Sequence, residues 1–299
     1  MRSPVHSTAT AFAVASLGIA AFSTMDAVMK DLAIGIGAYN ALLWRTLAGA
    51  VIGGLVFFVR RSAWPGREAG RIHLLRGILS AAMAMLFFWG LARVPLAQGV
   101  ALSFVAPLIA LYLAAWLLKE KIERQAILAS LLGFAGVIVI LSGQAAADLG
   151  PEAFEGAIAI LISAGLYAYN IILMRRQAQV AGPLEVAFFM SLIMTGCFLF
   201  AAPALAEVPA AAEWPAILGA ALLAFVSLML LSWAYARAEA QHLAPVEYTA
   251  FVWASFFGYL IFDEPVRPFT LVGAAMIVTA CIIAARRRPV SIAEMEAAL

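Results

Sequence analysis

The chain has 299 residues, of which 65% are hydrophobic and only 12% are charged, and its formal net charge is +2. A soluble domain of this length could not cover its surface with so few charged side chains, so the composition excludes a soluble globular protein. The small net charge gives no indication of nucleic-acid binding. Both cysteines, Cys197 and Cys281, lie within apolar segments, so the sequence predicts no disulfide framework.

Apolar stretches of about 18–22 residues recur along the chain, and each is long enough to cross a bilayer core of about 30 Å as a helix. The sequence therefore predicts an all-α integral membrane protein with ten transmembrane helices. In chain order we expect them at residues 9–30, 38–59, 72–92, 96–118, 124–143, 155–176, 183–203, 214–236, 243–262 and 268–285. No small-residue cleavage site follows the first stretch, so we expect it to remain a span.

The basic residues predict the orientation of these helices. Most of the 19 Lys and Arg residues fall on one side of the membrane, in segments that include residues 60–71, 119–121 and 286–288. His73 and Arg76 are expected at the edge of the same side. Positive residues are enriched in cytoplasmic loops. The sequence therefore predicts that both termini are cytoplasmic.

The chain also contains an internal repeat. Residues 85–120 resemble residues 229–264 at a shift of about 144 positions, and the matches include Trp89 with Trp233, Arg93 with Arg237 and Glu120 with Glu264. Each half holds five predicted spans, so the second half enters the membrane inverted, which is typical of secondary transporters. We expect a first repeat at residues 1–143, a connecting loop at 144–154, a second repeat at 155–288 and a cytoplasmic tail at 289–299.

The end of each repeat resembles a known family. The first copy reads WGLARVPLAQGVALSFVAPLIALYLAAWLLKEKI, with a small residue before Arg93, a central Pro107 and a closing Glu120. This pattern is similar to the EamA-type families of the drug/metabolite transporter superfamily, nearest the YddG-type exporters of aromatic and neutral amino acids. The second copy departs from it because Pro245 lies early in its helix. The resemblance implies a ten-helix basket whose central cavity is lined by the third, fourth, eighth and ninth helices and gated by the first and sixth.

Charged residues within spans are candidates for function, because isolated charge there costs at least about 2.5–3.5 kcal/mol. Asp26 and Arg45 fall at similar depth in the first two helices, so we expect them to face each other or a shared cavity. They either form a bridge between these helices or contact a carboxylate or amine of the substrate. Lys30, one helical turn after Asp26, is a competing partner for it.

Several polar and aromatic side chains are further candidates for substrate binding. Tyr169, Asn170 and Trp253 fall too deep for an interfacial belt, so we expect them to point inward. Phe87 adds an aromatic surface in the third helix. The serines either bind the polar groups of a substrate or donate to their own helices. These serines are Ser103, Ser227 and Ser255.

Prolines and helix-end acids are candidates for gates and hinges. Pro107 and Pro245 are expected hinges, and the alternative is a static kink. Glu247 and Glu185 are gate or proton-relay candidates, or simply acids in a first helical turn. Glu120 and Glu264 lie at helix ends, where they either anchor the helix at the interface or lock two helices together.

We predict a secondary transporter that exports aromatic and other apolar or neutral amino acids across a bacterial-type inner membrane by alternating access. The alternative is transport of S-adenosylmethionine or another metabolite or drug. An enzyme is not favoured, because the three histidines have no metal-ligand spacing. The sequence has no phosphate-binding loop ending in Lys-Ser or Lys-Thr, so we do not expect ATP to drive transport. We therefore expect no catalytic residues, metal ligands or cofactors. The expected partners are amino acids and the lipid bilayer, not nucleic acid, and the expected state is a monomer or weak homodimer.

Overall fold

The computed structural model describes residues 8–118, 124–146, 150–235 and 246–285, and all regular structure within these ranges is helical. The helices are α1 (Thr8–Gly35), α2 (Ala38–Val59), α3 (Arg67–Leu91), α4 (Leu96–Ser103), α5 (Ala106–Leu118), α6 (Arg124–Ala146), α7 (Pro151–Val180), α8 (Pro183–Leu205), α9 (Trp214–Tyr235), α11 (Thr249–Phe262) and α12 (Pro268–Ala285). Every predicted span overlaps a helix in this series, as expected where hydropathy is so strongly patterned.

The fourth predicted span, residues 96–118, differs from the rest because it is two helices, α4 and α5. The backbone tightens before Pro107: the N–H groups of Phe104 and Val105 donate to carbonyls only three residues back, at 3.2 and 3.3 Å. Proline lacks an N–H and its ring excludes the preceding helical turn. The helix therefore breaks at residues 104–105 and restarts with Pro107 in its first turn.

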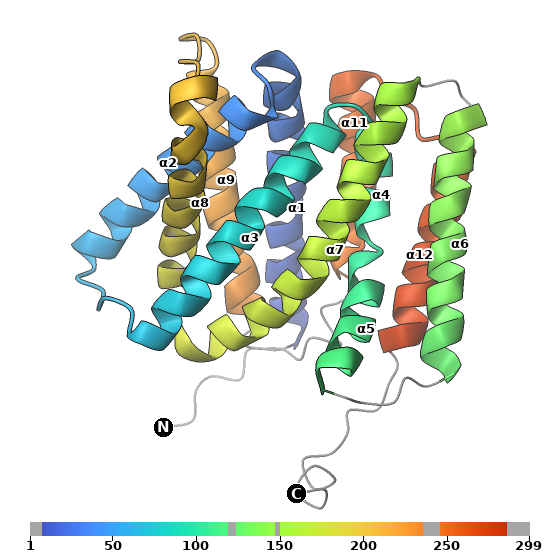
Figure 1. Ribbon diagram of the computed structural model, residues 1–299, viewed down its shortest axis with the longest axis horizontal. Coiled ribbons are helices and arrows are strands. Elements are labelled where there is room, and N and C mark those ends of the chain that lie inside the picture. Colours follow the sequence, from blue (N-terminus) through green and yellow to red (C-terminus); the bar gives the residue numbers. More distant parts are fainter. Residues whose placement is uncertain (1–7, 119–123, 147–149, 236–245, 286–299) are drawn as a thin grey trace, which may run out of the picture.

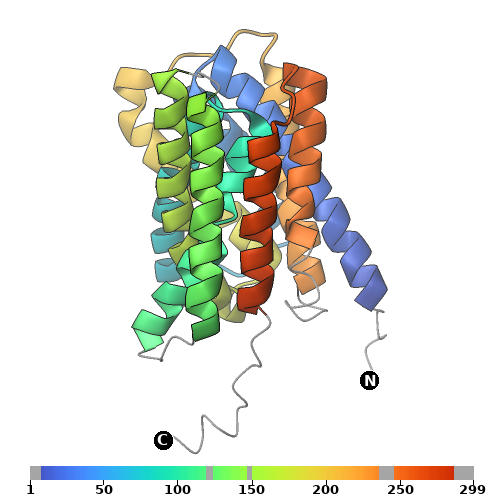
Figure 2. The same ribbon diagram turned by 90° about the vertical axis from the view of Figure 1, so that its right-hand side faces the viewer.

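The helices lie side by side in one bundle (Figures 1 and 2). In the described residues, six helices are long and apolar enough to cross a membrane, and four shorter apolar helical stretches accompany them. This is the architecture of a multi-pass membrane protein. The first helix begins and the last helix ends at the same end of the bundle, which we call the terminal end (lower end in Figure 1); the opposite end is the far end.

Helices from the two halves of the chain pack against each other in pairs: α1 with α9, α3 with α7, α2 with α8 and α6 with α12. Glycines permit the closest of these contacts. A Cβ atom on Gly90 of α3 would lie 2.4 Å from the backbone oxygen of Gly156 in α7, and one on Gly136 of α6 would lie 2.7 Å from that of Gly273 in α12. Small residues drive helix association in membranes because they let backbones approach.

We expect Gly90→Ala to destabilise the protein, because its methyl group would meet rigid backbone of α7 rather than a side chain that can move. Overpacking of this kind costs about 1–3 kcal/mol. Gly219→Ala in α9 is the matched control, since a Cβ atom added there would have no heavy atom within 4 Å. Thermal unfolding of the purified protein in detergent measures both variants. Equal midpoints would contradict this account of the α3–α7 contact.

Candidate functional site

Asp26 and Arg45 lie close enough in the bundle for their charges to interact. Asp26, on α1, is only 6% exposed, and Arg45 lies on α2. Asp26 Oδ1 and Arg45 Nε are both buried, yet neither has a hydrogen-bond partner in the part of the chain that the structure describes. One Arg45 amino group contacts Met25 Sδ at 3.9 Å. Two opposite charges thus lie together with hydrogen-bonding capacity unused, which is unfavourable in a buried setting unless a ligand uses it.

Lys30 does not compete for Asp26, because it is held elsewhere. This side chain is 1% exposed, and its ammonium forms a buried ion pair with the Glu264 carboxylate. It also donates to the carbonyl oxygen of Val94 at 2.7 Å and lies 4.8 Å from the centre of the Phe262 ring. A charge-assisted hydrogen bond and a cation–π contact therefore compensate for its removal from water.

Glu264 connects three helices at the far end of the bundle. Its second oxygen accepts a hydrogen bond of 2.8 Å from the N–H of Leu96, the first residue of α4. A carboxylate at this position is favourable because helix N-termini carry unpaired N–H groups and partial positive charge. Asp263, in the left-handed conformation at φ 53°, ends α11 and turns the chain into this contact. We call the contacts of Lys30 and Glu264 with Val94 and Leu96 the far-end lock.

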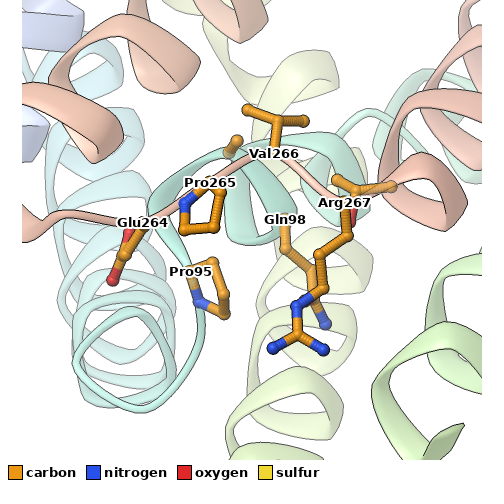
Figure 3. Close-up of a pocket in the computed structure, with 8 residues that line it drawn as sticks. Pro95, Gln98, Glu264, Pro265, Val266 and Arg267 are labelled. Atoms are coloured by element: carbon orange, nitrogen blue, oxygen red, sulfur yellow. The ribbon is translucent and has the colours of Figure 1, made fainter. Parts of the chain in front are cut away.

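For Glu264, the sequence left open an interfacial anchor or a lock between two helices, and the far-end lock is of the second kind. Glu120, which matches Glu264 in the first repeat, lies outside the described residues. Beside the lock is a small pocket of about 10 Å³, lined by Pro95, Gln98 and Arg267 among others. Figure 3 shows the Glu264 carboxylate pointing away from Arg267 across this pocket. The volume suits about one water molecule, so the far end offers no space for a metabolite here.

A second buried polar cluster joins α3, α7 and α8. On α3, the Arg76 guanidinium donates to Asn170 Oδ1 at 3.1 Å and to the Gln177 side-chain oxygen, both on α7. The Gln177 amide contacts His73 Nδ1 at 2.6 Å, and His73 Nε2 lies 2.9 Å from a Glu185 oxygen on α8. His73 and Arg76 were expected at the cytoplasmic edge, but they are buried, at 0% and 7% exposure. Amides and a carboxylate from neighbouring helices, rather than water, contact these two side chains. Their position at the membrane edge stays a prediction.

Arg76 differs from Lys30 because its hydrogen bonds go to amides rather than to a carboxylate. The two ion pairs found among the described residues do not include it. The Tyr167 hydroxyl lies within electrostatic reach of both Arg76 and Glu247. A buried guanidinium without a counter-ion is costly in a membrane and marks a binding or pathway position.

The aromatic candidates separate in space. Asn170 is 2% exposed and belongs to the Arg76 cluster, but the adjacent Tyr169 lines a groove between α3 and α7. Trp253 is 36% exposed and stacks on Phe257 at an interplanar angle of 24°. The expected inward orientation of Trp253 is therefore wrong, since helix α11 directs this ring to an exposed face. Phe87 is half-buried and packs edge-on against Phe88.

The serine hydroxyls have protein partners in this structure. Ser103 and Ser255 donate to Val100 and Phe251 in their own helices, at 2.7 Å in both cases. Ser227, which is fully buried on α9, donates to the carbonyl of Gly18 on α1 at 2.8 Å and so ties these helices together. Of the gating candidates, Glu247 is exposed just before α11 and Pro245 lies outside the described residues.

The sequence held an unused signal for the Arg76 cluster. Ser163, Asn170 and Gln177 recur at intervals of seven residues in α7, which places them on one helix face. All three are buried, and Ser163 also bonds to α3, donating to the carbonyl of Met83 at 2.8 Å. A polar stripe within an apolar span indicates a face that packs against protein. The partner helix was not deducible from the stripe alone.

Buried charges held between apolar spanning helices define the class of this protein as a multi-pass membrane protein with an internal polar site. The described residues hold no group of three side chains suited to binding a metal ion. A family model, the EamA-like transporter family, matches residues 9–142 and again residues 154–286. The chain therefore belongs to the EamA-like transporter family.

Relatives of known name agree with this membership. The chain is 24% identical to the pseudopaline exporter CntI of Pseudomonas aeruginosa over 273 residues, covering 89% of this chain and 93% of the relative. It is 26% identical to the S-adenosylmethionine uptake transporter of Rickettsia bellii, covering 89% and 90%. A solved crystal structure has the same fold, with a TM-score of 0.64 at 19% identity and coverage of 94% and 100%. Both named relatives are transporters, one an exporter and one an importer.

The far-end lock predicts an energetic coupling between Lys30 and Glu264. We expect Lys30→Met and Glu264→Gln each to lower thermal stability, because each leaves a buried polar partner unsatisfied. In the double variant the second change should cost less, giving a coupling of about 0.5–3 kcal/mol. A double-mutant cycle of unfolding in detergent measures this value. Strict additivity would show that the ion pair contributes nothing to holding α1 against α4 and α11.

Proposed function

We propose that this transporter exports amino acids with apolar or aromatic side chains, bound as zwitterions near Asp26 and Arg45. The observation that carries the proposal is the pair of buried, oppositely charged groups with unpartnered atoms, Asp26 Oδ1 and Arg45 Nε. An α-amino acid presents an ammonium and a carboxylate a few ångströms apart. Each would supply the hydrogen bond that one of these groups lacks, which favours a zwitterion over a neutral or singly charged solute.

The surroundings support an apolar side chain on this substrate. Met25 and Met29, on the same helix as Asp26, belong to the main hydrophobic core, together with Leu42 of α2. Methionine side chains adapt their shape to different apolar and aromatic groups. A site of this composition would accept several neutral amino acids rather than select one.

Alternating access between two inverted halves is the proposed mechanism. The family model matches the two halves separately, and the repeats are proposed at residues 1–143 and 155–288, with 144–154 between them. The packing supports a two-fold relation between the halves. If each helix is replaced by its counterpart in the other half, the α1–α9 pair becomes the α7–α3 pair, which is also present. The α2–α8 and α6–α12 pairs are each made of two counterparts, so they are unchanged by this replacement. In inverted-repeat transporters, such an exchange relates the two access states.

The far-end lock closes one end of this pathway, because it holds α1, α4 and α11 together at that end. We infer that the terminal end is cytoplasmic in an inner membrane, following the excess of Lys and Arg there. Substrate would then enter from the cytoplasm, and release would require the lock to open. The break at residues 104–105, between α4 and α5, is the proposed hinge.

S-adenosylmethionine is the second candidate substrate. It carries the same amino-acid zwitterion beside a sulfonium, and the Rickettsia bellii relative is named as its uptake transporter. The same pair of charges would bind this end of the molecule. The two proposals differ in the direction of transport and in the size of the group attached to the zwitterion, so transport assays distinguish them.

Counterflow in proteoliposomes tests the proposal. Vesicles loaded with one unlabelled amino acid should accelerate entry of labelled phenylalanine or methionine. Asp26→Asn and Arg45→Gln should each reduce this rate about tenfold or more, because each removes a charge-assisted bond of about 1.5–3 kcal/mol. The matched controls are Asp31→Asn on α1 and Arg60→Gln at the end of α2, which change exposed residues and should transport normally.

Two outcomes would contradict the proposal. Exchange of S-adenosylmethionine without exchange of any amino acid would show that S-adenosylmethionine, the second candidate, is the substrate. Normal counterflow in both Asp26→Asn and Arg45→Gln would show that the unpartnered charges do not bind substrate.

A further inference from the structure

A groove at the terminal end lies outside the proposed substrate site. Its volume is about 810 Å³, and the first turns of α3 and the last turns of α7 form its walls. These two helices run side by side (Figure 1). The volume falls within the range of about 300–1,000 Å³ that is typical of ligand sites. The groove holds Tyr169 but not Asn170, because successive helical residues point about 100° apart.

The lining of this groove is amphipathic. Arg67 and Arg71 on α3 and Arg176 on α7 line it, against a single acidic residue, Glu68. Leu75 and other aliphatic side chains line it as well. Three guanidinium groups beside an aliphatic wall match an anion joined to a hydrocarbon chain, because arginine pairs with phosphate oxygens in a bidentate manner.

Most of the side chains of α3 and α7 that line the groove are exposed. His73 and Arg76 of α3 are buried and bond to α7 and α8, whereas Arg71 and Leu75, on a neighbouring face of α3, are exposed. Both helices also expose aliphatic side chains beyond the groove, toward the far end: Ile78 of α3 is 50% exposed and Ile162 of α7 is 53% exposed. Contiguous exposed aliphatic surface on spanning helices is in contact with acyl chains.

We propose that this α3–α7 groove binds an anionic phospholipid, with its phosphate between Arg67, Arg71 and Arg176 and its acyl chains along Leu75 and Ile78. Basic pockets between transmembrane helices recognise anionic headgroups in this way. Tyr169 also lines the groove, and its hydroxyl can donate a hydrogen bond to a ligand there. The occupant is a lipid rather than free phosphate, because the aliphatic wall is part of the site.

Lipid in this groove is placed to stabilise the α3–α7 pair. Leu75 precedes Arg76, and Tyr169 precedes Asn170, so the groove and the Arg76–Asn170 hydrogen bond lie on neighbouring faces of the same two helices. An anion that pairs with both Arg71 of α3 and Arg176 of α7 would link the two helices. It also opposes separation of the helices at the terminal end. We infer that lipid composition controls the stability of this end.

Binding is tested on the full-length protein in detergent, without substrate. The probes are phosphatidylglycerol and phosphatidylcholine with identical acyl chains, together with soluble glycerol 3-phosphate. Native mass spectrometry counts bound lipid, and thermal unfolding reports stabilisation. We expect phosphatidylglycerol alone to remain bound and to raise the unfolding midpoint.

The variants are Arg71→Gln with Arg176→Gln, and the matched control is Arg60→Gln with Arg61→Gln. The control pair is exposed near the same end of the bundle but does not line the groove. We expect about a fivefold loss of phosphatidylglycerol affinity for each groove arginine removed, and no loss in the control.

Three results would overturn the proposal: equal stabilisation by both lipids, equal stabilisation by glycerol 3-phosphate, or equal loss in the control pair. Because no transported solute is present, the result is independent of the counterflow assay. If the counterflow assay shows no amino-acid transport, a positive lipid-binding result still stands. If lipid does not bind, a positive counterflow result still stands.

Discussion

A lysine ammonium buried between apolar helices is the constraint on which the far end of this bundle depends. Lys30 is 1% exposed, and its charge is tolerable only because the Glu264 carboxylate, the Val94 carbonyl and the Phe262 ring surround it. Glu264 in turn satisfies the first N–H of α4. One carboxylate therefore serves as counter-ion and helix cap at once. Moving α1 away from α4 and α11 would leave the buried Lys30 ammonium without its counter-ion and without the Val94 carbonyl, which opposes separation at this end.

The other buried charges are compensated less completely than the charge of Lys30. Asp26 and Arg45 keep unpartnered atoms, and Arg76 bonds to amides rather than to a carboxylate. A contact that only holds helices together is most stable when every buried polar atom in it has a partner, as in the far-end lock. Groups that must bind and release a solute cannot be fully satisfied by the protein. This difference supports the proposal that Asp26 and Arg45 bind the substrate.

Much of the fold was predictable because its signals are local. Each span is marked by an uninterrupted apolar stretch, and Pro107 marks the break between α4 and α5. The candidate site was predicted unevenly. Asp26, Arg45 and Asn170 were found because a charge or amide in a span is anomalous by itself. Trp253 was misplaced, because depth in the membrane says nothing of rotation about the helix axis. The partners of His73 and Arg76 were not predicted, because they belong to later helices.

The sequence by itself determined that this chain crosses a membrane many times, where its helices run and that it resembles the EamA-type families. Hydropathy, proline and local motifs act within about twenty residues, so they can be read without knowledge of the packing. Only the tertiary structure decided that Lys30 pairs with Glu264, 234 residues away, rather than with Asp26 one turn before it. It likewise decided that Tyr169 lines the groove at the terminal end, whereas the adjacent Asn170 is buried against Arg76. Partner choice depends on which helices lie together and on how each is rotated, and both are set by the packing of the whole bundle.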